Sequence, residues 1–223
     1  MQARSSAPLA TERHVFAGIL LDFDGTIIDS TEAIIQNWKN VAAELNIDYR
    51  DILRASHGRR AIDVLQELAP TEADWEYVSA MESRTPYLCP TQAAEIPGAC
   101  DLLQTLTRHS IPHAIVTSGS RALVTAWLTD VVAGKPDPEG YCKAKERLLK
   151  ACNVRADVLV IEDAPAGIRA GKAAGYRVLA VTTTHSVLEL KDAGADWVVS
   201  DLRRVRVEGM GSSGVGVVFS DLL

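Results

Sequence analysis

The fold of this chain is decided by one stretch, Ile19-Leu20-Leu21-Asp22-Phe23-Asp24-Gly25-Thr26. It completes an almost unbroken apolar run that begins at Val15. Such a run predicts one strand over residues 15–21, covered on both faces of a parallel sheet. Gly25 permits a sharp turn directly after that strand.

The two carboxylates of this stretch follow the predicted strand. In open α/β sheets, ligands bind at the carboxyl ends of the strands, and side chains two residues apart share one face. We therefore expect Asp22 and Asp24 to point into one small site. Their mutual repulsion calls for a cation, and hard oxygen ligands suit Mg²⁺. The alternative is an ordinary Asp-Gly turn with a solvated acidic neighbour.

Composition and charge are those of a globular chain. The 223 residues are 47% hydrophobic, which leaves room for one large domain or a core with an insert. A net charge of −6 argues against nucleic acid as a partner. No apolar run approaches the ~20 residues needed to span a membrane. We expect a monomer with a disordered N-terminus over residues 1–13.

The four cysteines form no close pair of the Cys-x-x-Cys type. Cys89, Cys100, Cys142 and Cys152 lie at least ten residues apart in sequence. They are typical of a chain kept in a reducing compartment, so we expect a cytoplasmic protein.

Helices and strands follow one another in an order that predicts the fold class. Apolar residues at helical spacing predict helices over residues 32–45, 59–68 and 71–84, and no strand is evident between residues 31 and 90. Later strands are expected at residues 114–116, 158–161, 178–181 and 197–199, and a glycine/serine-rich loop at 209–216. We predict a Rossmann-like parallel α/β core, residues 14–30 and 91–223, with an all-helical cap inserted at 31–90.

Three further segments place reactive groups at turns or strand ends. Thr117 and Ser118 follow an apolar strand, where a hydroxyl and main-chain N–H groups at a helix start could bind phosphate. Lys135 lies on a rigid Gly-Lys-Pro turn. The pair Glu162-Asp163 ends another buried strand and would add a third carboxylate to Asp22 and Asp24.

In this order, the segments resemble the four motifs of the haloacid dehalogenase-like hydrolases. Residues 22–26 resemble the first motif, Thr117 the second, Lys135 the third and Glu162-Asp163 the fourth. The helical insert resembles the small cap of the β-phosphoglucomutase-like branch. Within that branch, three segments resemble the fungal glycerol-phosphate and 2-deoxyglucose-6-phosphate phosphatases. They are Ser56-His57-Gly58-Arg59-Arg60, residues 162–168 and residues 170–175.

The resemblance implies a Mg²⁺-dependent phosphatase acting on a small phosphate ester. Asp22 would attack phosphorus as the nucleophile, and Asp24 would act as general acid and then as general base. Mg²⁺ would be held by Asp22, Asp163 and the main-chain carbonyl of Asp24. Lys135 and Thr117 would bind the remaining phosphate oxygens.

Other residues are implied to bind the substrate or to support the site. Ser118 is a further phosphate-binding candidate. In the cap, His57, Arg59 and Arg60 are candidate substrate readers, and we expect at most one of the two arginines to reach the site. Glu162 would either orient metal-bound water or anchor the third-motif lysine.

Two other functions remain open at this stage. A sugar phosphomutase of the same family would carry a cap histidine about a dozen residues past the nucleophile, where this chain has Ala33, Ile34 and Ile35. Asp24 argues against a haloacid dehalogenase, which has no alkoxide to protonate. A catalytically impaired binding protein is the other alternative, because the segment before Lys135 is short.

That short segment predicts a displaced lysine. A helix that ends near Leu128 would end at the edge of the sheet opposite the active site. The chain must then span roughly 15–20 Å to return to the carboxyl edge of the sheet. The seven residues 129–135 span at most roughly 23–25 Å when fully extended. We therefore expect a missing or shortened edge strand and a poorly held Lys135, with weak phosphate binding and slow turnover.

Overall fold

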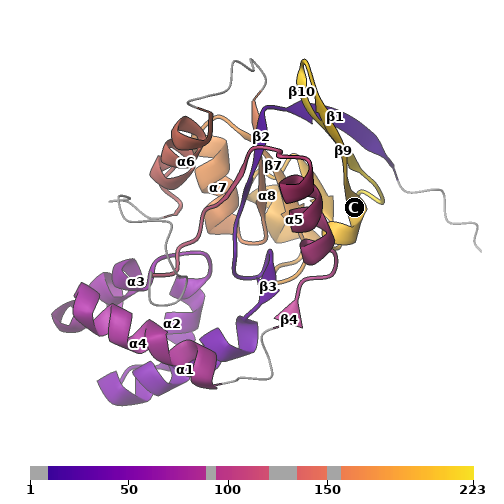
Figure 1. Ribbon diagram of the computed structural model, residues 1–223. Helices are drawn as coiled ribbons and strands as arrows, with labels where there is room; N and C mark the ends of the chain where they lie inside the picture. The colour runs from indigo at the N-terminus through magenta and orange to yellow at the C-terminus, as the bar shows by residue number, and fades with distance from the viewer. Residues whose placement is uncertain (1–9, 89–93, 121–134, 150–156) are drawn as a thin grey trace, which may run out of the picture.

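The computed structural model describes residues 10–88, 94–120, 135–149 and 157–223. Its centre is a five-stranded parallel sheet with the strand order β5-β2-β6-β7-β8 (Figure 1). The strands are β2 (Gly18–Leu21), β5 (His113–Ile115), β6 (Val158–Glu162), β7 (Arg177–Val181) and β8 (Trp197–Val199). Because β2 and β6 are neighbours, the residues that follow them meet at the carboxyl edge of the sheet. The predicted α/β fold class is confirmed.

Both faces of this sheet are covered. Leu20 and Val160 pack with residues of the helices α6 (Glu139–Leu149), α7 (Pro165–Ala173) and α8 (Val187–Asp192). Ile19 and Leu21 point to the opposite face, where they pack with α5 (Ala99–Arg108) and with a second sheet. Burial on both faces explains why these strands are continuous apolar runs in the sequence.

The second sheet corrects the prediction of a single strand over residues 15–21. The apolar run divides at Ala17, whose N–H donates to the carbonyl of Asp157 (2.7 Å). Residues before it form β1 (Glu12–Phe16), which pairs antiparallel with β10 in a different sheet from β2. Hydropathy could not reveal this break because the residues on both sides of it are buried. The prediction of disorder was also wrong for Glu12 and Arg13, which belong to β1.

A hairpin replaces the loop predicted at residues 209–216. β9 (Val205–Gly211) follows a short 3₁₀ turn, η2 (Leu202–Arg204), and pairs with β10 (Gly214–Phe219). Gly214 has a φ of 128°, and a Cβ there would lie 2.3 Å from the carbonyl oxygen of Phe16. Glycine therefore allows two strands to approach closely at this position. The sequence pattern alone predicted a loop because glycines are common in both settings.

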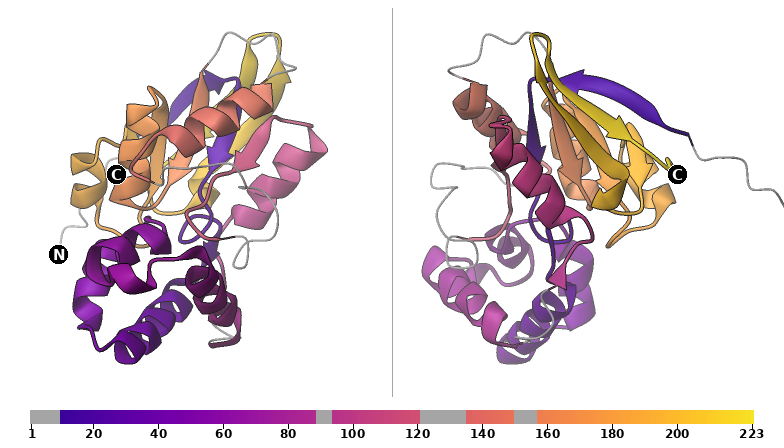
Figure 2. Two further views of the ribbon diagram at one scale, coloured as in Figure 1. Left: turned by 90° about the vertical axis from the view of Figure 1, so that its left-hand side faces the viewer. Right: turned by 45° about the vertical axis from the view of Figure 1, so that its right-hand side comes forward.

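Four helices gather at the carboxyl end of the central sheet (Figures 1 and 2). They lie in the chain between two short paired strands, β3 (Ile28–Asp29) and β4 (Ala94–Glu95). We call them the cap helices: α1 (Thr31–Leu45), α2 (Tyr49–Ser56), α3 (Ala61–Leu68) and α4 (Trp75–Leu88), with the 3₁₀ turn η1 (Pro70–Glu72) before α4. They share a separate hydrophobic core that includes Trp38, Leu65 and Met81. The division of the chain at residues 30/31 and 90/91 stays a prediction, and residues 89–93 lie outside the described ranges.

The start of α4 differs from the predicted helix over residues 71–84. Thr71 belongs to the 3₁₀ turn, and α4 begins three residues after that turn ends. Asp74 caps it, because its Oδ1 accepts from the N–H of Tyr77 (2.8 Å). Within the described ranges, no helix combines the length and the apolar character needed to cross a membrane.

Candidate active site

The nucleophile candidate lies where β2 ends. The N–H of Asp22 donates to the carbonyl of Ile161 (3.0 Å), so the main chain still follows β6, and the Asp22 side chain is buried. The chain then turns at Gly25, whose φ is 84°. A Cβ at Gly25 would lie 2.3 Å from Asp163 Oδ2, so any other residue would separate the ends of the two strands.

Asp24 lies beside Asp22 at the same cavity. Its Oδ1 accepts from the hydroxyl of Ser30 (2.6 Å), which fixes the carboxyl group in one orientation. Burial raises the pKa of Asp24, and the hydrogen bond from Ser30 only partly opposes this effect. A carboxyl group with a raised pKa holds its proton to higher pH, as a general acid must.

Lys135 is firmly placed, and the prediction that it would be displaced was wrong. Its Nζ lies 2.5 Å from Asp22 Oδ1 and 2.5 Å from Glu162 Oε1, and the side chain is only 6% exposed. Burial alone would lower the pKa of Lys135, but the two carboxylates outweigh it and raise that pKa. The ammonium group is therefore charged and lies between two of the acids. The predicted change in the edge strand falls on residues 121–134, outside the described ranges.

Glu162 anchors this lysine. Its Oε1 accepts from Lys135 and from the hydroxyl of Tyr141 (2.6 Å), and its Oε2 accepts from the N–H groups of Asp163 (3.1 Å) and Ala164 (3.3 Å). With four donors and no exposure, the carboxylate has a fixed position. Of the two roles considered from the sequence, the geometry favours anchoring of Lys135.

The acids at this edge fit a metal ion. Ligand oxygens of Asp22, Glu162 and Asp163 all lie within 4.8 Å of one another, and all three residues are buried. Burial and the neighbouring Glu162 raise the pKa of Asp163 to about 7, and the same two causes raise the pKa of Asp22 well above its usual value. Three carboxylates face one ammonium group, so the site is short of positive charge. Since Glu162 is occupied by its donors, Asp22 and Asp163 are the residues available to a metal.

The carboxylate of Asp163 is held by hydroxyl groups. Thr184 donates to Asp163 Oδ2, and Thr26, which is fully buried, donates to Oδ1 (3.5 Å). His185 lies next to this pair, with its Nδ1 3.2 Å from the carbonyl oxygen of Asp163. These contacts orient the carboxylate toward the end of β2.

The loop after β5 carries the second-motif residues and connects them to the cap helices. Thr117 Oγ1 accepts from the N–H of Gly119 (3.0 Å) and lines the cavity. Ser118 Oγ donates to the carbonyl of Gly58 in the cap (2.8 Å), and the N–H of Ser120 donates to Glu82 Oε2 on α4 (2.7 Å). The helix start expected after this loop falls on residues outside the described ranges.

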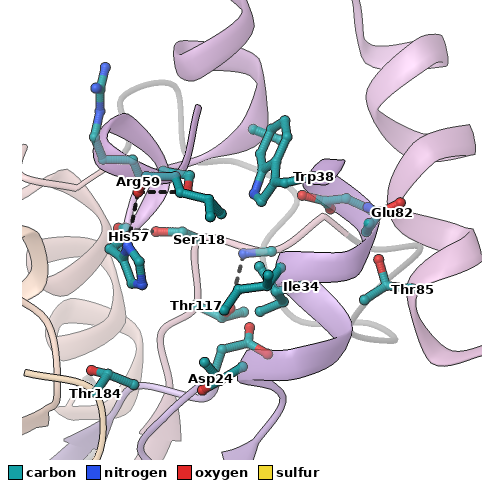
Figure 3. A pocket seen from close by; sticks show the side chains of 18 of the residues that line it. Asp24, Ile34, Trp38, His57, Arg59, Glu82, Thr85, Thr117, Ser118 and Thr184 are labelled. Atoms are coloured by element: carbon teal, nitrogen blue, oxygen red, sulfur yellow. Dashed lines mark hydrogen bonds between the residues drawn. The ribbon is translucent and has the colours of Figure 1, made fainter. Parts of the chain in front are cut away.

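One cavity of about 110 Å³ joins these groups to the cap helices (Figure 3). His57 lines it and lies close to His185, with ring centroids 5.2 Å apart. Arg59 also lines it, although its guanidinium is bonded to the carbonyl of Ala55 (3.2 Å) and to Glu67 (3.1 Å). Arg60 is not among the lining residues and pairs with Asp63 instead (2.7 Å).

Three buried polar residues that line the cavity were missed by the sequence analysis. Asn37 on α1 and Glu82 and Thr85 on α4 are buried polar residues at the cavity. A signal for them exists, because Val78, Met81, Glu82 and Thr85 follow the i, i+3, i+4, i+7 pattern of one buried helix face. A carboxylate on an otherwise apolar helix face is unusual, and it identifies the wall of a site.

A parallel sheet that ends in buried carboxylates and a charged lysine, with a cavity closed by helices, defines a class of enzymes that act on phosphate groups. A family model described as haloacid dehalogenase-like hydrolase matches residues 16–175. The chain belongs to this family. Relatives that are 33–35% identical over 84% or more of this chain are phosphatases, so the chain is a phosphoric monoester hydrolase.

Several relatives match most of the chain, among them two yeast enzymes and one from Escherichia coli. Glycerol-1-phosphate phosphohydrolase 2 of Saccharomyces cerevisiae is 34% identical over 228 residues, covering 92% of this chain and 90% of the relative. 2-Deoxyglucose-6-phosphate phosphatase 1 of the same yeast is 35% identical, covering 88% of this chain and 92% of the relative. Hexitol phosphatase A of Escherichia coli is 33% identical, covering 85% of this chain and 93% of the relative.

Solved structures show the same fold. A hydrolase from Pseudomonas syringae superposes with a TM-score of 0.68 at 25% identity, covering 83% of this chain and 94% of that chain. A family IA hydrolase from Entamoeba histolytica superposes with a TM-score of 0.70 at 22% identity, covering 86% and 96% of the two chains.

Proposed function

We propose that this enzyme hydrolyses small polyol and sugar phosphates, glycerol phosphate among them, with Mg²⁺ and through an aspartyl phosphate on Asp22. One observation carries the proposal: Asp22 lies 2.5 Å from Lys135 Nζ and shares its cavity with Asp24 and Thr117. The named substrates of the relatives, glycerol 1-phosphate and 2-deoxyglucose 6-phosphate, support the substrate class. The cavity of about 110 Å³ suits the smaller of these molecules.

Hydrolysis proceeds in two steps. A carboxylate oxygen of Asp22 attacks phosphorus, the ester P–O bond breaks, and the departing alkoxide takes the proton from Asp24. Asp24, now ionised, removes a proton from a water molecule, which attacks phosphorus and breaks the bond to Asp22. Lys135 and Thr117 bind the oxygens on which negative charge is spread in both transition states.

The surrounding residues hold these groups in position. Ser30 keeps the Asp24 carboxyl group turned toward the cavity, and Glu162 keeps Lys135 beside Asp22. Asp22 and Asp163 would hold Mg²⁺ together with the main-chain carbonyl of Asp24. When bound, the ion would supply the positive charge that lets a carboxylate approach a phosphate dianion.

Hydrolysis is favoured over a mutase reaction by the residues on α1. At the positions where a mutase would present a histidine, Ile34 and Ile35 line the cavity, and an isoleucine cannot take the proton from a second sugar hydroxyl group that attacks phosphorus. The alternative of a catalytically impaired binding protein depends on a displaced Lys135. Since Lys135 lies beside Asp22, this alternative loses its support.

A phosphate-release assay tests the proposal. The panel contains glycerol phosphates, hexose 6-phosphates and 2-deoxy sugar phosphates with Mg²⁺, each repeated after chelation. We expect activity that chelation removes and Mg²⁺ restores, and a loss of at least ~10³-fold in Asp22→Asn. That variant should keep its melting temperature, because Lys135 retains Glu162 as a partner. Comparable turnover in Asp22→Asn and the wild type would refute the proposed nucleophile.

We also propose that the enzyme acts in the cytoplasm as a monomer. Cys100 and Cys142 are unpaired, in keeping with a reducing compartment. Cell fractionation and size-exclusion chromatography test these two points separately.

A further inference from the structure

Three buried polar residues of the cap helices line the cavity with hydrogen-bonding atoms that no described residue uses. Asn37 and Thr85 are each 4% exposed and Glu82 is 8% exposed. Within the part of the chain that the structure describes, the side chains of Asn37 and Thr85 make no hydrogen bond, and Glu82 is bonded only through its Oε2, to the N–H of Ser120. Among the described residues, the inaccessible side-chain atoms without a partner belong to Ser120 and Arg204, so the unused atoms of the three residues remain accessible. The unused groups therefore open on the cavity.

Unpaired polar groups at such positions need an explanation. Water in the cavity can satisfy these groups, but a helix face that packs in a hydrophobic core seldom carries a carboxylate unless a polar ligand meets it. Val78 and Met81 lie on the same face of α4, so an apolar residue in place of Glu82 would be compatible with the helix. A ligand that takes these hydrogen bonds in place of cavity water explains why polar residues occupy these positions.

The arrangement of the three groups identifies the chemistry of that ligand. A carboxylate, an amide and a hydroxyl group together can accept and donate several hydrogen bonds, which suits a chain of hydroxyl groups. The carboxylate repels a second phosphate group. Arg59, which lines the cavity, is bonded to Glu67 and so does not offset this repulsion. Ile34 and Trp38 also line the cavity, and they provide apolar contacts for the carbon chain (Figure 3).

We propose that Asn37, Glu82 and Thr85 form a hydroxyl-binding subsite that selects polyol phosphates over phosphate esters of plain alcohols. This inference rests on the proposed function and adds the residues that decide which ester is used. Glu82 is the central member because Ser120 fixes its carboxylate, and Ser120 belongs to the same loop as Thr117. The loop thus sets the spacing between the hydroxyl-binding groups and the phosphate-binding groups.

The size of the substrate preference depends on the hydrogen bonds that the subsite loses when the substrate lacks a hydroxyl group. A site built to hydrogen-bond a substrate hydroxyl group can reject the analogue that lacks it by up to ~10⁴–10⁵-fold when water is excluded. Here the groups also meet cavity water, so we expect a smaller preference, roughly 10²-fold in kcat/KM, for glycerol 1-phosphate over n-propyl phosphate.

The test measures kcat/KM for both esters in the wild type, Glu82→Gln and Thr85→Val. We expect Glu82→Gln to reduce the preference for glycerol 1-phosphate by at least about tenfold, and Thr85→Val by roughly threefold. Glu44→Gln is the matched control. It removes a carboxylate from α1 that is exposed and paired with Arg84, and it should leave the preference unchanged.

Direct binding to the inactive variant separates this proposal from the proposed function. Calorimetry with Asp22→Asn and Asp22→Asn/Glu82→Gln compares the affinities for the same two esters without turnover. A selective loss of glycerol 1-phosphate binding supports the subsite even where phosphate release is absent. An equal loss for both esters, or no loss, in both the kinetic and the binding experiment would overturn it. Activity in Asp22→Asn would refute the nucleophile and leave the subsite result standing.

Discussion

Gly167 in helix α7 lies directly against the carboxylate of Glu162. A Cβ at this position would be 1.7 Å from Glu162 Oε1 and 2.0 Å from its Cδ. To reach a tolerable contact of 3.0 Å, the carboxylate must move by at least about 1.3 Å. It has little room to do so, because it is fully buried and bonded to Lys135 and Tyr141. We therefore expect Gly167→Ala to displace the anchor of Lys135.

The effect on stability and the effect on activity should differ in size. Alanine favours the helix by roughly 0.5–1 kcal/mol, whereas overpacking a filled interior destabilises by roughly 1–3 kcal/mol, so the net loss should be roughly 0–2.5 kcal/mol. Removal of one transition-state donor reduces kcat by roughly 10²–10³-fold. Lys135 would be displaced and not removed, so we expect kcat/KM to fall by roughly 10–100-fold.

The assay compares Gly167→Ala with Gly171→Ala on the same helix. A Cβ at Gly171 would meet Val178 Cγ2 at 2.9 Å, which is also a tight contact but lies away from the acids. Steady-state kinetics with glycerol phosphate and thermal unfolding are measured for both variants. Gly171→Ala should be destabilised with kcat/KM within about threefold of the wild type. Wild-type kcat/KM in Gly167→Ala would refute the reasoning, because Glu162 would then not be required to hold Lys135.

Two other substitutions test neighbouring groups. Asp24→Asn should reduce kcat for alkyl phosphates by roughly 10²–10⁴-fold but affect p-nitrophenyl phosphate far less, because its phenolate leaves without a proton. Equal losses on both substrates would contradict a general-acid role. Tyr141→Phe removes one donor from Glu162 Oε1, and we expect a loss of roughly 1.5–3 kcal/mol in the free energy of unfolding and a fall in kcat of a few-fold. Denaturant titration and kinetics measure both effects, and an unchanged midpoint would show that the hydrogen bond contributes nothing.

The strands that hold the active site were predictable because they are buried on both faces. The predicted strand at residues 197–199 is the observed β8, and those at 158–161 and 178–181 differ from β6 and β7 by one residue. Burial on both faces leaves an unbroken apolar run with turn residues at its end, and the acids Asp22 and Asp163 follow such runs. The outer sheet lacks this signal. Gly214 serves a close strand contact there, and in sequence it is indistinguishable from a glycine of a loop.

The error on Lys135 shows what chain length can and cannot predict. The reach of seven extended residues sets only the largest distance that the segment can span, and the required climb was within that limit. Where the side chain then lies is decided by charge. Asp22 and Glu162 are buried acids that gain from a nearby cation, and both meet the lysine ammonium group at 2.5 Å. Chain length alone does not include the stabilisation that these two acids gain from the lysine.

The two parts of the site differ in how the sequence encodes them. The residues proposed to act on the phosphate lie at the ends of strands or in turns that the sequence predicts. Their chemistry can therefore be inferred from motifs. The groups proposed to bind the polyol come from the middle of α1 and α4, and Asn37 and Glu82 become neighbours of the cavity only when these helices pack together. The sequence of a helix does not show which residues its faces will contact, so the packing must be known first. The reaction is therefore more predictable from this sequence than the substrate, and substitutions on the cap helices are the direct route to the substrate.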